Sequence, residues 1–158
     1  MRDMTVCFLI RGTSPHEVLL GYKKRGFGAG KFAGIGGRVE AGETIRAAAC
    51  REVYEETGIT TTEHDLQAMG AITFRFPNQP TWNQVVHVFI VTRWTGEPNE
   101  SDEMLPTWYP TDAVPFEQMW DDSQYWLPQI LASQPLQAQI TYADDNATVC
   151  DVQVATPE

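Results

Sequence analysis

The chain contains short apolar runs, such as residues 6–10 and 85–91, and a segment at 69–76 in which apolar and polar residues alternate; both patterns are typical of β-strands. These patterns predict strands at residues 6–10, 17–22, 69–76 and 85–94, a short strand at 108–109, and a closing hairpin of 137–142 and 148–154. A Ser14-Pro15 turn separates the first two segments, which we therefore expect to form a hairpin. Residues 77–80 and the acidic, proline-containing residues 97–106 are predicted to be loops.

The pattern changes to a helical one between Thr44 and Thr57. Its apolar stripe, at spacings of three and four, consists of Ile45, Ala48, Ala49 and Val53. Thr44 is a suitable N-cap and Gly58 a suitable glycine after the last turn. These features predict one long central helix.

A second helix is predicted at residues 122–132, begun by Asp122 or Ser123 and strained by Pro128. Mixed strands with two helices indicate an α/β or α+β fold. A length of 158 residues suits one domain, so we expect a single domain over residues 1–158.

A glycine-dense segment lies between the first strands and the central helix. Residues 26–42 hold seven of the 12 glycines, which predicts a loop with unusual backbone angles or a close approach to another group. The loop is not a P-loop, because Gly30-Lys31 lacks the earlier glycine and the following Ser or Thr. It contains no G-x-G-x-x-G dinucleotide motif.

The central helix carries three acidic residues at spacings of three and four. Glu52, Glu55 and Glu56 therefore share one face, and Arg51 can neutralise one of them. On an ordinary surface helix such a cluster is more often a solvated acidic face. Here the glycine-dense loop runs directly into the helix, and its backbone can reach the same point. The carboxylates then favour a site for Mg²⁺ or Mn²⁺.

The basic residues add to this picture. The loop and its approach contain the main basic cluster of the chain: Lys23, Lys24, Arg25, Lys31 and Arg38. Backbone amides, cations and a metal around one point suggest a bound oligophosphate.

Charge limits the range of ligands. The formal net charge is −10, and residues 94–158 contain 12 acidic residues and neither Lys nor Arg. This argues against binding to a nucleic-acid polymer or an anionic membrane. The first apolar run is too short for a secretory or membrane-spanning segment, so we expect a cytoplasmic protein. Three cysteines without a C-x-x-C pair suggest neither a disulfide framework nor a cysteine-based zinc site.

One motif spans the loop and the helix. Gly37 is followed after five residues by Glu43 and after seven more by Arg51-Glu52-Val53-Tyr54-Glu55-Glu56-Thr57-Gly58-Ile59, which resembles the complete signature of the Nudix family. The resemblance implies an α/β/α sandwich with a central mixed β-sheet. It also implies a metal-dependent hydrolase acting on nucleoside diphosphates linked to another group.

The resemblance also implies roles for individual residues. Glu52, Glu55 and Glu56 would bind metal or handle the proton of the attacking water, with the general base left open. Arg51 would orient a carboxylate, the carbonyl of Gly36 would add a metal ligand, and Glu103 would supply another from the acidic loop. Lys23, Gly36 and Gly37 would lie at the substrate's phosphates.

Segments outside the motif resemble Nudix members that act on oxidised purine nucleoside triphosphates. By this resemblance Phe27, Phe74 and Trp120 line a base pocket, and Asp121 and Asp122 read the hydrogen-bonding edge of the purine. A carboxylate accepts hydrogen bonds when ionised and can donate when protonated, so a close pair could read either arrangement. Ala33 stands where these members have a base-contacting asparagine, which leaves the preferred base open.

The leading interpretation is an Mg-dependent pyrophosphohydrolase that converts nucleotides such as 8-oxo-dGTP or 2-hydroxy-dATP to the monophosphate and pyrophosphate. One alternative is a Nudix hydrolase of another nucleotide: an unmodified triphosphate, a modified pyrimidine nucleotide or a nucleotide sugar. Another is a non-catalytic nucleotide-binding regulator, against which the complete glutamate set argues. The expected partner is a small nucleotide, and the sequence leaves the oligomeric state open.

Overall fold

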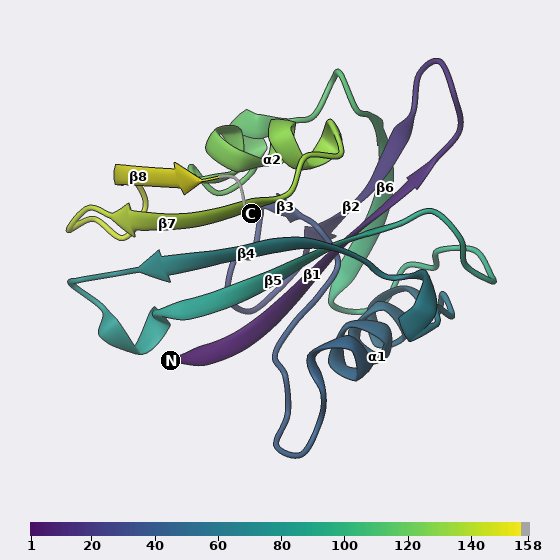
Figure 1. The fold of residues 1–158 in the computed structure, drawn as a ribbon, viewed down its shortest axis with the longest axis horizontal. Coiled ribbons are helices and arrows are strands. Elements are labelled where there is room, and N and C mark those ends of the chain that lie inside the picture. The colour runs from purple at the N-terminus through teal and green to yellow at the C-terminus, as the bar shows by residue number, and fades with distance from the viewer. Residues whose placement is uncertain (156–158) are drawn as a thin grey trace.

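The computed structural model describes residues 1–155 and contains a strongly twisted mixed sheet with the strand order β3-β2-β1-β5-β4-β7-β8, in which β6 also pairs with β2 (Figure 1). The strands are β1 (Arg2–Arg11), β2 (Glu17–Lys23), β3 (Phe32–Ala33), β4 (Gln67–Arg75), β5 (Gln84–Val91), β6 (Met104–Pro110), β7 (Leu136–Tyr142) and β8 (Val149–Ala155). The β1–β2 and β7–β8 hairpins are antiparallel, whereas β1–β5 and β4–β7 are parallel. Both predicted hairpins are therefore confirmed.

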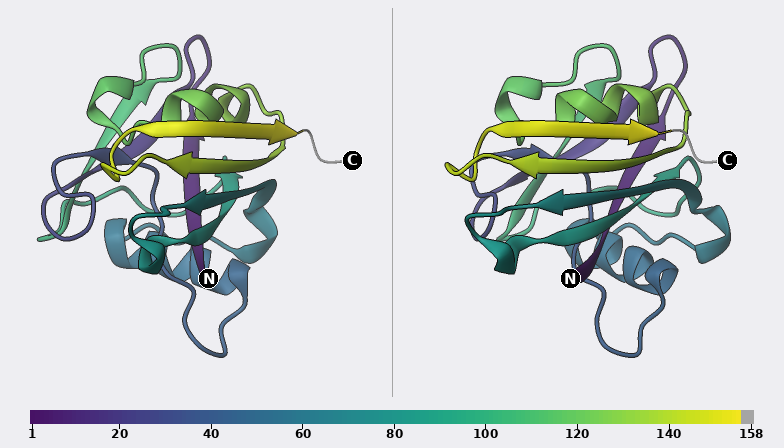
Figure 2. Two further views of the ribbon diagram at one scale, coloured as in Figure 1. Left: turned by 90° about the vertical axis from the view of Figure 1, so that its left-hand side faces the viewer. Right: turned by 60° about the vertical axis from the view of Figure 1, so that its left-hand side comes forward.

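The two helices cover opposite faces of this sheet (Figures 1 and 2). Helix α1 (Ile45–Thr57) packs on β1 and helix α2 (Ser123–Leu131) packs on β7. Successive residues of β1 divide between two cores: Cys7 and Leu9 face the cluster that includes α1, and Phe8 faces the cluster that includes α2. This confirms the predicted α/β/α sandwich with a mixed sheet.

The ends of α1 are set by local sequence, as expected. The side-chain hydroxyl of Thr44 accepts a hydrogen bond of 3.1 Å from the amide of Ala47, and Gly58 adopts a left-handed φ of 80°. A hydroxyl N-cap satisfies an otherwise free amide, and glycine takes the left-handed conformation without a Cβ clash. These caps fix where the helix begins relative to the loop before it.

Two loop predictions were incomplete. The glycine-dense segment includes the two-residue strand β3, and β6 begins at Met104, inside the range expected to be an acidic loop. Strand β6 was not predicted in full because its prolines and the acidic residues before it are typical of a loop. Strand β6 pairs along its length with β2 alone, and an edge strand tolerates proline because one side of its backbone needs no partner.

Helix α2 is present and contains Pro128, as expected. Asp122 occupies the position before its first residue, yet its side chain makes no capping hydrogen bond. Neither helix within residues 1–155 has the length and hydrophobicity needed to cross a membrane.

Candidate active site

The glycine loop is held against β1 by backbone hydrogen bonds. The amide of Thr5 donates to Gly37 O at 2.8 Å, and the amide of Cys7 donates to Ile35 O at 2.7 Å. A Cβ on Gly36 would lie 1.9 Å from Thr5 O, and one on Gly37 would lie 2.5 Å from the carboxyl carbon of Glu52. Both glycines are therefore required by close approach, the first to a strand and the second to a site carboxylate.

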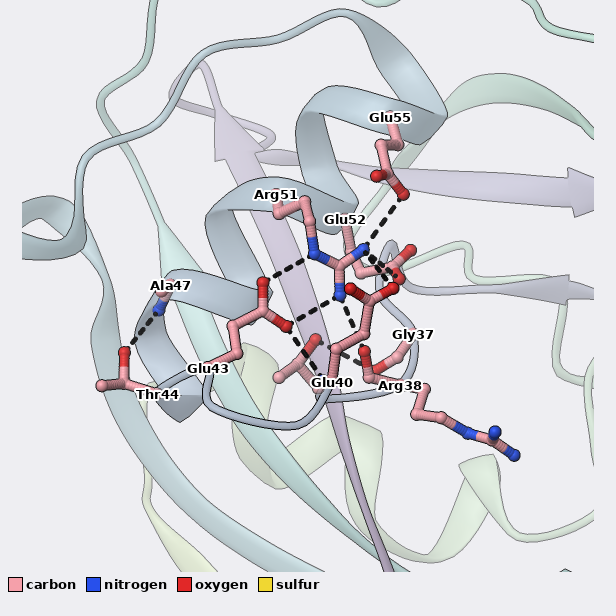
Figure 3. Close-up of polar contacts among 10 residues, drawn as sticks. Gly37, Arg38, Glu40, Glu43, Thr44, Ala47, Arg51, Glu52 and Glu55 are labelled. Atoms are coloured by element: carbon pink, nitrogen blue, oxygen red, sulfur yellow. Dashed lines mark hydrogen bonds and ion pairs between the residues drawn. The ribbon is translucent and has the colours of Figure 1, made fainter.

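Arg51 organises the carboxylates of the site (Figure 3). Its Nε and Nη2 donate to the two oxygens of Glu43 at 2.7 and 2.9 Å, and Nη1 donates to Glu52 at 2.9 Å and Glu55 at 3.1 Å. Nη2 also donates to the carbonyl of Arg38 at 2.9 Å. A planar guanidinium suits such bidentate contacts. One arginine thus ties the loop to the helix and holds Glu52.

The charge of Glu43 is stabilised within this network. Hydrogen bonds from Arg51 and from the amide of Glu40 lower the pKa of Glu43 to about 2. The same carboxylate, together with Glu52, raises the pKa of Arg51 above its usual range, so the guanidinium remains charged. Glu43 is therefore a permanent anchor for Arg51.

Glu56 has a different environment. Burial, reinforced by the neighbouring charge of Glu52, raises the pKa of Glu56 to about 8, although the Lys23 ammonium opposes the shift. Burial also raises the pKa of Glu52, against the opposing effect of Arg51. Two half-buried carboxylates with raised pKa values form a place where added positive charge is stabilising.

The donor set fits a hard divalent cation. One pocket is lined by Glu52, Glu55, Glu56 and Glu103, with Arg25, Ser101 and Asp102. Oxygen donors of this kind suit Mg²⁺ or Mn²⁺. Within residues 1–155 no three His, Cys, Asp or Glu side chains already lie close enough together to hold a metal ion. Arg51 Nη1 donates to Glu52 and Glu55, and Arg25 Nη2 lies 3.6 Å from Glu103 Oε1.

A groove leads away from these carboxylates. It is lined by Lys23, Gly36, Glu56 and Glu103 at one end and by Phe27, Lys31, Ala33 and Trp120 at the other. Lys23 adds positive charge beside the carboxylates, and Lys31 lies 5.4 Å from the centre of the Trp120 ring. The arrangement suits a phosphate chain between a metal site and an apolar end.

The apolar end is an aromatic cavity between β1, β4, β5 and α2. Phe27 stacks on Trp120, with ring centres 5.2 Å apart, and the other lining residues include Phe8, Phe74, Gln84 and Tyr142. The structure thus brings together Phe27, Phe74 and Trp120. Phe74 is only 6% exposed and Phe27 48% exposed, so the first forms the floor and the second the rim. Flat apolar walls suit a nucleobase.

Asp122 reaches this cavity. It is 6% exposed, and its two oxygens accept hydrogen bonds from the Tyr142 hydroxyl and from Trp126 Nε1, the latter at 2.7 Å. The amide of Asp122 also donates to the Tyr142 oxygen at 3.3 Å. Burial raises the pKa of Asp122, and these two donors oppose that shift.

Asp121, in contrast, lies outside the cavity. Its carboxylate accepts hydrogen bonds from the amide of Val149 at 2.8 Å and from Gln124 Nε2 at 2.9 Å. It lines a separate surface pocket with Lys31 and Gln124. We expected both aspartates to bind the base, but the structure places only Asp122 in the cavity. Asp121 instead accepts hydrogen bonds from Val149 on β8 and from Gln124.

The sequence did not indicate a role in the site for three residues. Glu43 binds Arg51, and Trp126 and Tyr142 donate hydrogen bonds to Asp122. Glu43 was visible as a specified position of the motif. Tyr142 lies on the buried face of β7, two residues after Ile140. The alternation of buried and exposed positions along this strand could therefore have placed Tyr142 in the core. Nothing in the sequence linked it to Asp122, 20 positions earlier.

A family model described as the NUDIX domain matches residues 1–130. The chain therefore belongs to the Nudix family. It is 49% identical over 123 residues to the oxidized purine nucleoside triphosphate hydrolase of Danio rerio, a match covering 78% of this chain and 77% of that protein. It is 40% identical over 138 residues to the Mus musculus protein of the same name, covering 87% and 86%.

A solved structure confirms the fold. The crystal structure of the mutator MutT protein from Bacillus halodurans matches with a TM-score of 0.82 and 25% identity, covering 98% of this chain and 97% of that one. Nudix hydrolases generally need a divalent metal, which agrees with the oxygen-rich pocket.

Proposed function

We propose that this Nudix hydrolase is a Mg²⁺-dependent pyrophosphohydrolase that converts oxidised purine (deoxy)nucleoside triphosphates, such as 8-oxo-dGTP or 2-hydroxy-dATP, to the monophosphate and pyrophosphate. The observation that carries the proposal is one groove that joins a carboxylate pocket to an aromatic cavity with a buried aspartate. The names of the zebrafish and mouse relatives support the substrate class. Such a role in nucleotide-pool sanitation suits a cytoplasmic enzyme.

At the phosphate end, Glu52, Glu55, Glu56, Glu103 and the carbonyl of Gly36 would hold the ion. When bound, the ion would neutralise phosphate charge and lower the pKa of a water molecule. Arg51 orients Glu52 through a hydrogen bond and opposes the rise that burial causes in the pKa of Glu52. Lys23 lines the groove and offsets the charge of the phosphate chain.

The reaction consumes one water. The water oxygen forms a bond to the α-phosphorus, the α–β anhydride bond breaks, pyrophosphate leaves, and a carboxylate of the cluster accepts the proton from the water. Phe27 and Trp120 would stack on the base, while Asp122 would bind its polar edge. Positioning both ends of the substrate keeps the anhydride at the carboxylates.

The test is release of the nucleoside monophosphate, measured with 8-oxo-dGTP, 2-hydroxy-dATP, dGTP, dATP, a nucleotide sugar and ADP-ribose, each with and without Mg²⁺. Pyrophosphate is measured as the second product of the triphosphates. We expect the highest kcat/KM for the oxidised purines and no turnover after chelation. Preference for an unmodified nucleotide or ADP-ribose would contradict the substrate proposal. Tight nucleotide binding without turnover of any substrate would favour a regulator instead.

A further inference from the structure

The Tyr142 hydroxyl donates a hydrogen bond to Asp122 at the wall of the aromatic cavity. The inference drawn from this contact concerns the choice of nucleobase, and it rests on the proposed function. The tyrosine hydroxyl has one proton and accepts the amide hydrogen of Asp122. Its own proton is therefore free to be donated to Asp122 Oδ1. Burial and the neighbouring Asp122 raise the pKa of Tyr142 above its usual range, so this proton stays on the hydroxyl.

The tyrosine ring is fixed in place. It stacks on Phe76 with ring centres 4.6 Å apart and meets the edge of Trp120 at 5.9 Å. The second oxygen of Asp122 accepts from Trp126 Nε1, a group that can only donate. Both carboxylate oxygens thus receive a hydrogen bond from a rigid neighbour, an arrangement that favours the ionised form.

Few other polar groups of the cavity could change the ionisation of Asp122. Among the described lining residues of the cavity, Asp122 and Tyr142 are the only titratable ones. Asp121 is adjacent in the chain but is bound to Val149 and Gln124, and Ala33 contributes a methyl group. Gln84, Ser123 and the indole N–H groups of Trp120 and Trp126 are the other polar side-chain groups among the described lining residues.

We propose that Tyr142 is a specificity-determining residue that holds Asp122 as a hydrogen-bond acceptor and so selects purines whose pyrimidine-ring edge presents two neighbouring donors to the two carboxylate oxygens. A guanine edge does this with N1–H and the 2-amino group, and the keto form of 2-hydroxyadenine does it with N1–H and the 6-amino group. An adenine-type edge presents N1 as an acceptor, which would face the carboxylate lone pairs. Because Asp121 is bound to Val149 and Gln124, Asp122 is the one carboxylate among the described residues that line the cavity.

The test compares 8-oxo-dGTP with 8-oxo-dATP, which share the oxidised imidazole ring and differ at the pyrimidine edge. We expect the wild-type protein to favour 8-oxo-dGTP by a factor on the order of 100 in kcat/KM, since a site built for hydrogen bonds rejects the mismatched edge. Similar values for the two nucleotides would overturn the inference. No turnover of 8-oxo-dGTP, 8-oxo-dATP or 2-hydroxy-dATP would instead refute the proposed function.

Variants then test Tyr142 itself. In Tyr142→Phe the preference should fall about tenfold, because a hydrogen bond to a charged group is lost. The acid limb of kcat/KM for 8-oxo-dGTP should also move to higher pH, an effect that looser packing alone would not produce. Tyr125→Phe removes an exposed hydroxyl from α2 and should leave both readouts unchanged.

Trp126→Phe removes the second donor and should shift the preference in the same direction. The wild-type preference should also decrease on acidification, as Asp122 becomes protonated, so the inference can be tested even if a variant does not fold. A folded Tyr142→Phe protein with wild-type preference and pH profile would overturn the role of Tyr142.

Discussion

The two ends of the groove are built in different ways. The carboxylate end comes from one continuous stretch, residues 36–56, with Glu103 added by the loop before β6. The aromatic end gathers Phe27, Phe74, Trp120, Asp122 and Tyr142 from segments far apart in the chain. In the proposed function, the first end performs the chemistry common to the family, and the second selects the base. Changes at the first should affect all substrates equally, whereas changes at the second should alter their ranking.

The largest expected effect is at Glu56. Glu56→Gln should lower kcat by at least about 10³-fold for every nucleotide, because the site loses a charge that binds metal or accepts a proton. Steady-state pyrophosphate release checks this, with circular dichroism to verify folding. Glu63→Gln, an exposed change beyond α1, is the matched control. Near-normal turnover by Glu56→Gln would refute this account of the carboxylate end.

Two glycine variants separate positioning from folding. A methyl group on Gly37 would meet the flexible end of Glu52, so Gly37→Ala should fold but lower kcat about 100-fold through a displaced carboxylate. A methyl group on Gly36 would meet the backbone of Thr5, so Gly36→Ala should lose stability. Urea unfolding and kcat measured on both variants check the contrast. Equal losses of stability would contradict it.

At the aromatic end, Trp120→Ala should raise KM about tenfold while changing kcat little, because a stacking face for the base is lost. Trp94 provides the control. It stacks on Trp108 in the core that includes α1, with ring centres 6.0 Å apart. Trp94→Ala should lower the melting temperature without raising KM. A fall in kcat alone for Trp120→Ala would mean that the two ends are not separable.

The smallest effect concerns pH and metal. The folded-state pKa of Glu56 is raised to about 8 from an ordinary 4.5, so the folded state binds the extra proton and stability of the metal-free protein falls as pH rises through this window. Mg²⁺ needs the ionised form. Its addition should therefore raise Tm by about 3 °C at pH 8.5 and by less at pH 6.5.

Differential scanning fluorimetry with Mg²⁺ and with a chelator measures this dependence. Glu56→Gln should largely abolish its pH dependence. A rise in Tm that is greater at pH 6.5 would contradict the prediction.

The sequence predicted those parts of the fold that depend on residues close together in the chain. The caps at Thr44 and Gly58, the helical stripe and the two hairpins needed only neighbouring residues. Strand β6 was underestimated because proline and acidic residues resemble a loop, and only its pairing with β2 supports it. The same distinction holds in the site, where the glutamate spacing located the carboxylates but did not show that Arg51 binds Glu43 through both oxygens.

The sequence by itself determined the family, the fold class and the carboxylate face of α1, because helical periodicity places residues three and four apart side by side. It also identified Trp120, Asp121 and Asp122 together as candidate residues for recognition of the base. Only the tertiary structure separated the two aspartates: the amide of Val149 binds one and the hydroxyl of Tyr142 the other. Their partners lie 28 and 20 positions away on β8 and β7, and such contacts depend on how the closing hairpin packs beside α2.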